Sequence, residues 1–168
     1  MIIKEKIGNI QALNLNGRMI DYLDLEWHET SKRILHKRTN AGKEIILKFL
    51  NQNHHLTEGD LLYEDEQGIV IVNIKACESI VIKPATMYDM AFICYEIGNK
   101  HLPLFYVNGE LLVPYEAPLI RLLQASGLNP SIEIRKLLNP LKTTVSAHSH
   151  PDSKSLFSRI LQLTSSNE

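Results

Sequence analysis

The sequence predicts an α+β protein, in which an all-β half precedes a half that mixes strands with helices. In residues 1–74, short apolar runs are separated by turns that contain Gly and Asn, which is typical of a small β-sandwich or barrel. From residue 75 onward, two segments with helical periodicity lie between strand-like segments. We therefore expect an N-terminal β domain over residues 1–74 and a second domain over residues 75–140.

Three segments define the expected β domain. Residues 22–29 alternate apolar with polar side chains, as a half-buried strand does. Residues 38–49 contain two strand-like runs on either side of a turn at Asn40-Ala41-Gly42. Residues 56–74 repeat this pattern with turns at two further Gly positions. Strands at this spacing predict a compact arrangement of sheets.

The second half is expected to follow the order β-α-β-β-α-β, which is the order of a ferredoxin-like domain. Two apolar periodicities predict the helices, and alternating or continuous apolar runs predict the strands. Caps and turns delimit these elements, because Thr favours helix starts, Asn-Gly favours hairpins and Gly favours helix ends. The delimiting residues are Pro84, Thr86, Gly98-Asn99, Asn108-Gly109, Pro118 and Gly127.

A third segment, residues 141–168, is rich in Ser, Thr and Pro, and we expect it to be a flexible C-terminal tail. It contains His148 and His150, whose side chains would lie on the same side of an extended chain. A flexible segment can rearrange around a metal ion at little cost. Two histidines by themselves nevertheless bind a metal weakly, so their spacing alone only suggests a site.

Charge and composition exclude several classes of protein. The chain has 18 Lys and Arg residues against 19 Asp and Glu residues, so we do not expect a nucleic-acid binder. No apolar run approaches the roughly 20 residues of a membrane span, and the first residues lack the features of a secretory signal. Cys77 and Cys94 are isolated from each other. Together these features predict a reduced, cytoplasmic protein that does not associate with membranes.

His101 lies just beyond the first expected helix, where a protonated imidazole would interact favourably with the helix dipole. Its spacing alone favours this capping role over metal binding. His28 shares an expected strand face with Asp24 and Glu26, although such polar alternation is more often a solvated face than a metal site. No nucleophile is paired with a base, and the motifs of hydrolases and nucleotide-binding enzymes are missing, so we expect no catalysis.

The segment CYEIGNKHLPLFYVNGELLVPYEAPLIRLL, residues 94–123, resembles the UreE family of urease accessory proteins, which are nickel metallochaperones. The most specific part is a helix that ends in Gly-Asn-Lys-His, followed by Leu-Pro-Leu and then by ELLVPY. Residues 25–47, residues 56–74 and the start of the chain also resemble this family, so the similarity covers nearly the whole sequence. This resemblance favours a metal-binding role for His101.

The resemblance implies a homodimer formed through the ferredoxin-like domains, with His101 of each subunit meeting at the two-fold axis. It implies a metal site made by His101 together with the tail histidines His148 and His150, either of which corresponds to the family's tail ligand. These imidazoles suit Ni²⁺ and also Zn²⁺. The implied function is delivery of Ni²⁺ for urease active-site assembly. Its implied partners are the urease accessory GTPase (UreG) and the urease maturation complex. Bulk nickel storage is not expected, because this tail has only two histidines.

The alternative interpretation is a ferredoxin-like RNA-binding module with an accessory β domain. In such a module, Phe105 and Tyr106 would stack on bases from the surface of the sheet. The sequence LPLFYVNG lacks the basic-glycine-aromatic pattern of these modules, and the charge balance also disfavours this interpretation.

Overall fold

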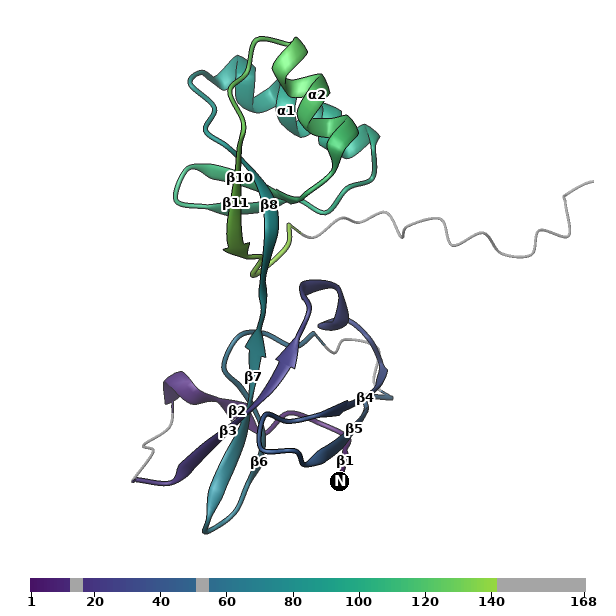
Figure 1. Cartoon of the computed structure of the whole chain (residues 1–168), viewed down its shortest axis with the longest axis vertical. Coiled ribbons are helices and arrows are strands. Elements are labelled where there is room, and N and C mark those ends of the chain that lie inside the picture. The colour runs from purple at the N-terminus through teal and green to yellow at the C-terminus, as the bar shows by residue number, and fades with distance from the viewer. Residues whose placement is uncertain (13–16, 51–54, 142–168) are drawn as a thin grey trace, which may run out of the picture.

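The structure is a computed structural model that describes residues 1–12, 17–50 and 55–141. Figure 1 shows two lobes, with β1 to β7 in the lower lobe and the two α-helices in the upper lobe. The strands of the first lobe are β1 (Ile2–Ile3), β2 (Gly8–Asn9), β3 (Met19–Leu25), β4 (Ile34–Arg38), β5 (Glu44–Lys48), β6 (Asp60–Glu64) and β7 (Gly68–Ile74). The second lobe contains β8 (Ala76–Ile82), α1 (Met87–Asn99), β9 (Phe105–Val107), β10 (Glu110–Pro114), α2 (Ala117–Ala125) and β11 (Ser131–Lys136). The α+β class is therefore confirmed.

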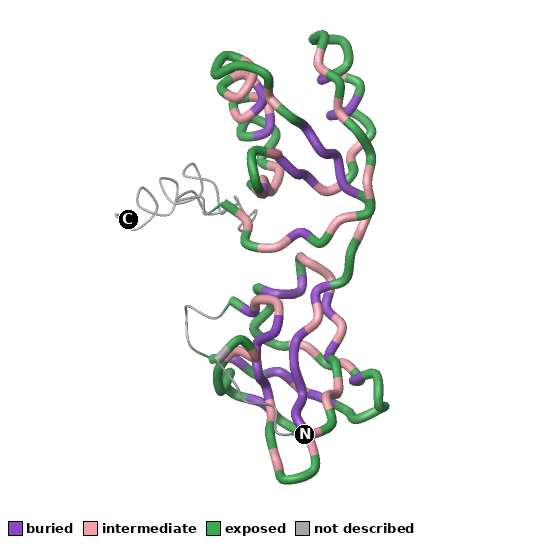
Figure 2. Tube along the Cα trace, turned by 90° about the vertical axis from the view of Figure 1, so that its left-hand side faces the viewer, coloured by how far each residue is buried: buried purple, intermediate pink, exposed green. Residues whose placement is uncertain are grey.

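The first lobe consists of two sheets that share one apolar core. The sheets have the orders β1-β5-β4 and β2-β6-β7-β3. Buried side chains from both sheets pack against each other: Ile3, Leu23, Leu25, Ile45, Leu47, Val70 and Val72. Two pairings, β1 with β5 and β3 with β7, are parallel, so this lobe is more than a succession of hairpins. In Figure 2, buried segments of the chain run through the interior of this lobe.

The strand expected over residues 22–29 is shorter than predicted. β3 ends at Leu25, and Trp27–Glu29 forms a 3₁₀ helix. The carboxylate of Glu29 accepts a hydrogen bond of 2.9 Å from the backbone N–H of Glu26, which closes this turn. His28 therefore does not share a strand face with Asp24 and Glu26. The alternation of apolar and polar residues predicts a continuous strand, but the local cap formed by Glu29 ends the strand before His28.

The second lobe has the element order β-α-β-β-α-β that the sequence predicted. Its four strands form one antiparallel sheet of order β11-β8-β10-β9, and Figure 1 shows both helices on the same side of this sheet. Asn108 and Gly109 have φ values of 51° and 85°, as a two-residue hairpin turn requires. The core between the sheet and the helices contains Ile80, Ile82, Ile93, Ile97, Leu111, Val113, Leu119 and Leu123.

Several side chains connect the lobes across the single residue Lys75, which separates β7 from β8. The rings of Trp27 and Phe105 meet edge to face with their centroids 6.0 Å apart. Lys136 donates hydrogen bonds of 2.8 Å to both Glu58 and Asn73. The division into domains at residue 74 stays a prediction, since these contacts join the two halves. The predicted tail lies outside the described residues, except for Leu141.

Within residues 1–12, 17–50 and 55–141, no helix has the length and the apolar character needed to cross a membrane.

Candidate metal site at the end of helix α1

His101 occupies a specific place in the cap that ends α1. The helix ends at Asn99, as the Gly98-Asn99 pair predicted. The left-handed residue of the cap is His101, two positions further on, whose φ is 54°. His101 N–H donates to the carbonyl of Gly98 at 3.0 Å, and Leu102 N–H donates to the carbonyl of Ile97 at 3.3 Å. These two hydrogen bonds define a Schellman motif with His101 as its left-handed residue.

This backbone geometry does not favour histidine. A left-handed φ usually belongs to Gly, although His is found there more often than most other residues. Holding a side chain in this region costs about 1–3 kcal/mol. The cap itself is made by main-chain groups, and the His101 imidazole forms no hydrogen bond or ion pair with any described residue. The imidazole is exposed to solvent and is therefore available to a ligand.

The sequence does contain a signal for this cap. A Schellman motif commonly places an apolar residue just after its left-handed residue, in contact with an apolar residue of the last helical turn. Leu102 follows His101, and both Leu102 and Ile97 belong to the core beneath the helices. This apolar pair five residues apart would have identified His101 as the turning point. The Gly98-Asn99 pair concealed it, because both residues are common helix terminators.

The other predicted ligands, His148 and His150, lie outside the described residues. Among residues 1–12, 17–50 and 55–141, no three His, Cys, Asp or Glu side chains gather closely enough to hold a metal. Asp24 and Glu26 are already used by protein partners, since Asp24 accepts from Asn73 at 2.7 Å and Glu26 pairs with Lys75 at 2.8 Å. The described part of one chain therefore presents His101 as a single ligand.

The helix that leads to His101 has an unusual solvent side. Tyr88 and Tyr95 lie seven residues apart on α1 and are 78% and 67% exposed. Ala91, between them, is also exposed. Residues spaced by three or four positions share one helix face. The solvent face of α1 thus carries two aromatic residues and one small residue, where a free helix would usually present charged residues.

The two cysteines do not add a reactive group to this region. Burial raises the pKa of both the Cys77 and the Cys94 thiol, so the thiolate form that binds metals or acts as a nucleophile is disfavoured. Cys94 packs with the apolar side chains beneath α1.

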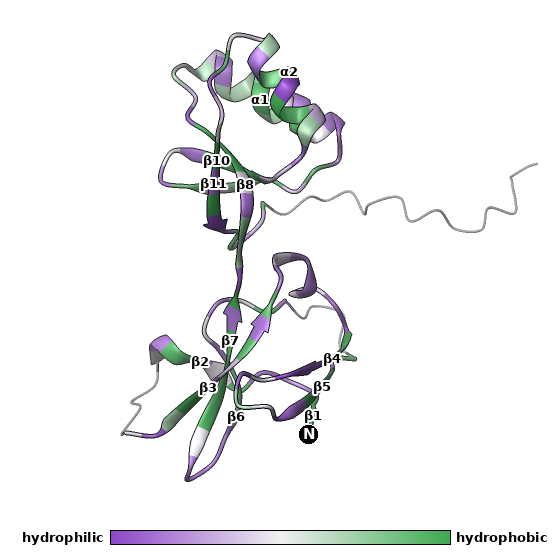
Figure 3. Cartoon of the chain, viewed as in Figure 1, coloured by the Kyte–Doolittle hydropathy of each residue, from purple (hydrophilic) through white to green (hydrophobic). Residues whose placement is uncertain are grey.

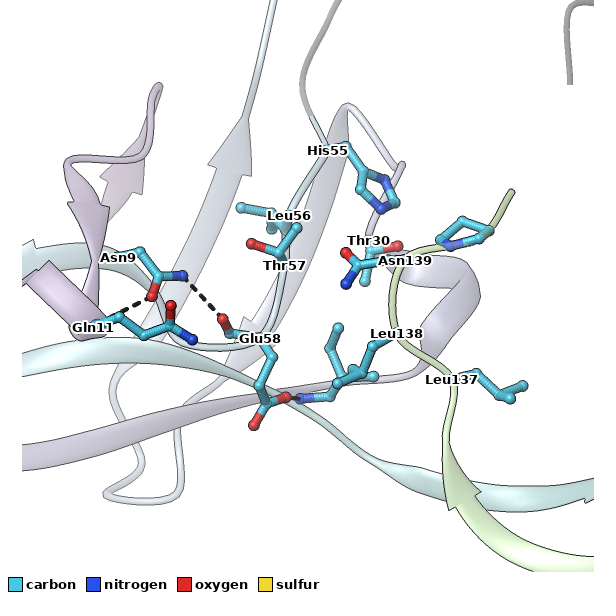
Figure 4. Close-up of a pocket in the computed structure, with 12 residues that line it drawn as sticks. Asn9, Gln11, Thr30, His55, Leu56, Thr57, Glu58, Leu137, Leu138 and Asn139 are labelled. Carbon is cyan, nitrogen blue, oxygen red and sulfur yellow. Dashed lines mark hydrogen bonds between the residues drawn. The ribbon is translucent and has the colours of Figure 1, made fainter. Parts of the chain in front are cut away.

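A cavity of about 290 Å³ lies where the lobes meet (Figure 4), and His101 is not among the residues that line it. Polar side chains line it, including Thr30, His55 and Asn139. The Glu58 carboxylate at its border is already bound to the backbone N–H of Ile74 at 2.7 Å and to Lys136 at 2.8 Å. None of the predicted metal ligands among the described residues lines this cavity.

Comparison with known proteins identifies the family. Residues 3–75 match the N-terminal domain of the UreE urease accessory protein. The urease accessory protein UreE of Flavobacterium johnsoniae is 41% identical over 163 residues, which cover 97% of this chain and 99% of the relative. UreE of Acetivibrio thermocellus is 38% identical, with 91% and 99% of the two chains covered. UreE of Helicobacter pylori is 39% identical, with coverages of 92% and 93%. The chain therefore belongs to the UreE family of urease accessory proteins.

Proposed function

We propose that this protein is a homodimeric nickel metallochaperone, which binds Ni²⁺ at its dimer interface and delivers it for urease active-site assembly. The observation that carries this proposal is the exposed imidazole of His101, whose backbone has a left-handed conformation that residues with a side chain disfavour. Strained residues of this kind are concentrated at functional sites. Membership of a family of urease accessory proteins supports the same conclusion.

A dimer would complete a site that one described chain leaves incomplete. A two-fold axis duplicates every residue near it, so one exposed histidine becomes two facing imidazoles. The exposed face of α1, with Tyr88 and Tyr95, supports an interface here, because aromatic residues are enriched in interface cores. This helix ends two residues before His101, so a dimer contact whose two-fold axis passes near the C-terminal end of α1 would bring the two histidines together.

Further imidazoles would come from His148 and His150 of the tail. Nitrogen ligands suit Ni²⁺, and they also suit Zn²⁺. A site with few protein ligands retains open positions through which an acceptor can remove the ion by ligand exchange. This property fits delivery better than storage. The partners in this proposal are the accessory GTPase UreG and the urease maturation complex in the cytoplasm, and the protein itself catalyses no reaction.

The RNA-binding alternative is not favoured. Phe105, which would have to stack on a base, is only 1% exposed and packs against Trp27. Tyr106 is exposed, but a single aromatic residue is a poor platform for two or three bases.

Equilibrium dialysis against Ni²⁺, with the oligomeric state measured on the same sample, tests the proposed function. We expect a tight site whose stoichiometry follows the dimer, and its loss in His101→Asn, because Asn tolerates the left-handed backbone but lacks the imidazole. His28→Asn is the matched control and should bind nickel as the wild type does. If His101→Asn retained wild-type nickel affinity, the assignment of His101 would be wrong.

A further inference from the structure

The sheet β1-β5-β4 presents a partly apolar surface to solvent. Its alternate side chains, such as Ile3, Ile45 and Leu47, are buried in the core of the first lobe. The remaining side chains point away from that core and form what we call the outer face: Ile2, Ile34, His36, Arg38, Glu44, Ile46 and Lys48. Ile2 and Ile34 are 60% and 58% exposed. Figure 3 shows hydrophobic and hydrophilic segments side by side in this part of the lobe.

The strand register gathers these residues into one patch. Ile2 lies opposite Ile46 across the β1-β5 pair, and Ile34 lies opposite Lys48 across the β5-β4 pair. Directly opposite residues on one face of a sheet have neighbouring side chains. Three isoleucines from three strands therefore lie within two adjacent rows, with His36 beside Ile46 in one row and Lys48 beside Ile34 in the other. A shallow depression of about 250 Å³ lies next to them, between Arg38 and Ile46.

The same segment of chain is strongly basic, which the overall charge balance conceals. Residues 32–48 contain six Lys and Arg residues and one acidic residue, Glu44. Glu44 pairs with Arg38 at 2.6 Å, but both side chains are at least 70% exposed, so solvent screens this pair. Lys32 and Lys37 pair with Glu29, and Lys37 lies on the core side of the sheet. Arg33 and Lys48 are exposed and form no ion pair with any residue that the structure describes.

We propose that the outer face of the sheet β1-β5-β4 binds a protein whose surface carries carboxylates around an apolar centre. Apolar side chains surrounded by charged ones are the usual composition of a protein interface. A second copy of this chain would bring like charges together on the same face, which disfavours self-association here. A nucleic acid would contact the cations but would leave the three isoleucines without an apolar partner. The surface is distinct from the proposed nickel site, and the proposed function enters only in the choice of binding partners to test.

The test uses the full-length protein and two purified probes, the urease accessory GTPase and the urease apoprotein in its maturation complex. Ile34→Glu places a negative charge in the apolar centre and should weaken binding of one probe at least about tenfold, as loss of a central contact does. Ile134→Glu on β11 is the matched control, because Ile134 is an equally exposed strand isoleucine (65%) on the other lobe. It should bind as the wild type does. Lys48→Glu provides a second variant in case Ile34→Glu does not fold.

Salt supplies an independent readout. Binding of the wild type should weaken as NaCl rises from about 50 mM to about 300 mM, because screening reduces attraction between exposed charges. The proposal is overturned if neither probe binds the wild type, if Ile34→Glu and Lys48→Glu both bind normally, or if Ile134→Glu binds equally weakly. Displacement of the probe by a single-stranded oligonucleotide would instead indicate a nucleic-acid surface and would also overturn it. Concentration-dependent self-association that Ile34→Glu abolishes would also overturn the proposal, because it would show that the outer face binds a second copy of this chain.

Nickel dialysis separates this proposal from the proposed function. Ile34→Glu should bind Ni²⁺ as the wild type does, since the outer face lies on the first lobe and His101 lies on the second. A wild type that binds a probe but no nickel would refute the metallochaperone and leave the docking surface standing. A wild type that binds nickel but neither probe would refute the docking surface and leave the metallochaperone standing.

Discussion

His101 and Gly127 hold equivalent positions at the ends of the two helices. Gly127 N–H donates to the carbonyl of Gln124 at 3.0 Å and Leu128 N–H donates to that of Leu123 at 3.1 Å, which repeats the hydrogen bonds around His101. The φ values are 54° at His101 and 80° at Gly127. One cap thus uses the residue that this geometry favours, and the other uses an imidazole. Selection for stability alone would favour Gly at both positions.

His101→Gly should therefore stabilise the fold while removing the proposed nickel site. Gly adopts a left-handed φ without steric cost, so we expect a gain of about 1 kcal/mol in the free energy of unfolding. Urea denaturation of the metal-free protein measures this gain, and nickel dialysis measures the loss of the site.

Gly127→His is the matched control for that experiment. It introduces the same strain into the same motif and should destabilise the protein by about 1 kcal/mol or more without affecting nickel binding. A destabilised His101→Gly would show that the imidazole contributes to the fold, and the interpretation of His101 as a strained ligand would then be abandoned.

Phe105→Ala should destabilise the protein by about 3–5 kcal/mol, because it removes a large, fully buried ring. Phe105 packs with Val81, Leu112 and Leu137 and meets Trp27 of the first lobe. Tyr106→Ala, its exposed neighbour, should change the free energy of unfolding by no more than about 0.5 kcal/mol. Thermal or urea unfolding compares the two variants. Similar values for both would contradict the burial of Phe105.

Glu29 should make stability depend on pH in the acid range. Burial of the Glu29 carboxyl raises its pKa. Hydrogen bonds from Lys37 and from the backbone of Glu26, together with the charges of Lys37 and Lys32, lower the pKa by more than burial raises it, so the net shift is downward. A carboxylate with a lowered pKa stabilises the folded state above its unfolded pKa of about 4.3, and this stabilisation is lost as pH falls through the folded value.

The Glu29→Gln variant tests this dependence. It should be less stable than the wild type at pH 7, because Lys37 loses its ionic partner. The difference between the two proteins should shrink as pH falls below about 4, where the wild-type carboxylate also becomes protonated. Urea unfolding at several pH values measures the difference. A constant difference would show that the charge of Glu29 does not contribute.

Truncation of the tail before Ala147 should leave a dimer that still binds Ni²⁺ through the paired His101 side chains. Affinity should fall, because His148 and His150 no longer supply imidazoles, and X-ray absorption should count fewer nitrogen ligands. The full-length protein with only His148 and His150 replaced by Ala is the control. It separates the loss of these two imidazoles from the loss of the rest of the tail. An unchanged ligand count in both proteins would exclude these two histidines from the site.

Local signals in the sequence determined most of the second lobe. Thr86 caps α1 through a 3.0 Å hydrogen bond from Asp89 N–H, and Asn108-Gly109 makes the hairpin. Gly127 ends α2 as expected. Each of these depends on residues within a few positions of one another, so the chemistry of a short segment suffices to predict it. The family motif likewise indicates His101 from a short segment of sequence.

Tertiary structure alone decided what depends on residues far apart in the chain. The parallel pairing of β3 with β7 joins segments about fifty residues apart, and no turn between them specifies it. Phe105 and Tyr106 are adjacent in sequence, yet contact with Trp27 buries the first and leaves the second exposed. The patch on the sheet β1-β5-β4 exists only because strand register gathers Ile2, Ile34 and Ile46 on one face, and register is a property of the assembled sheet.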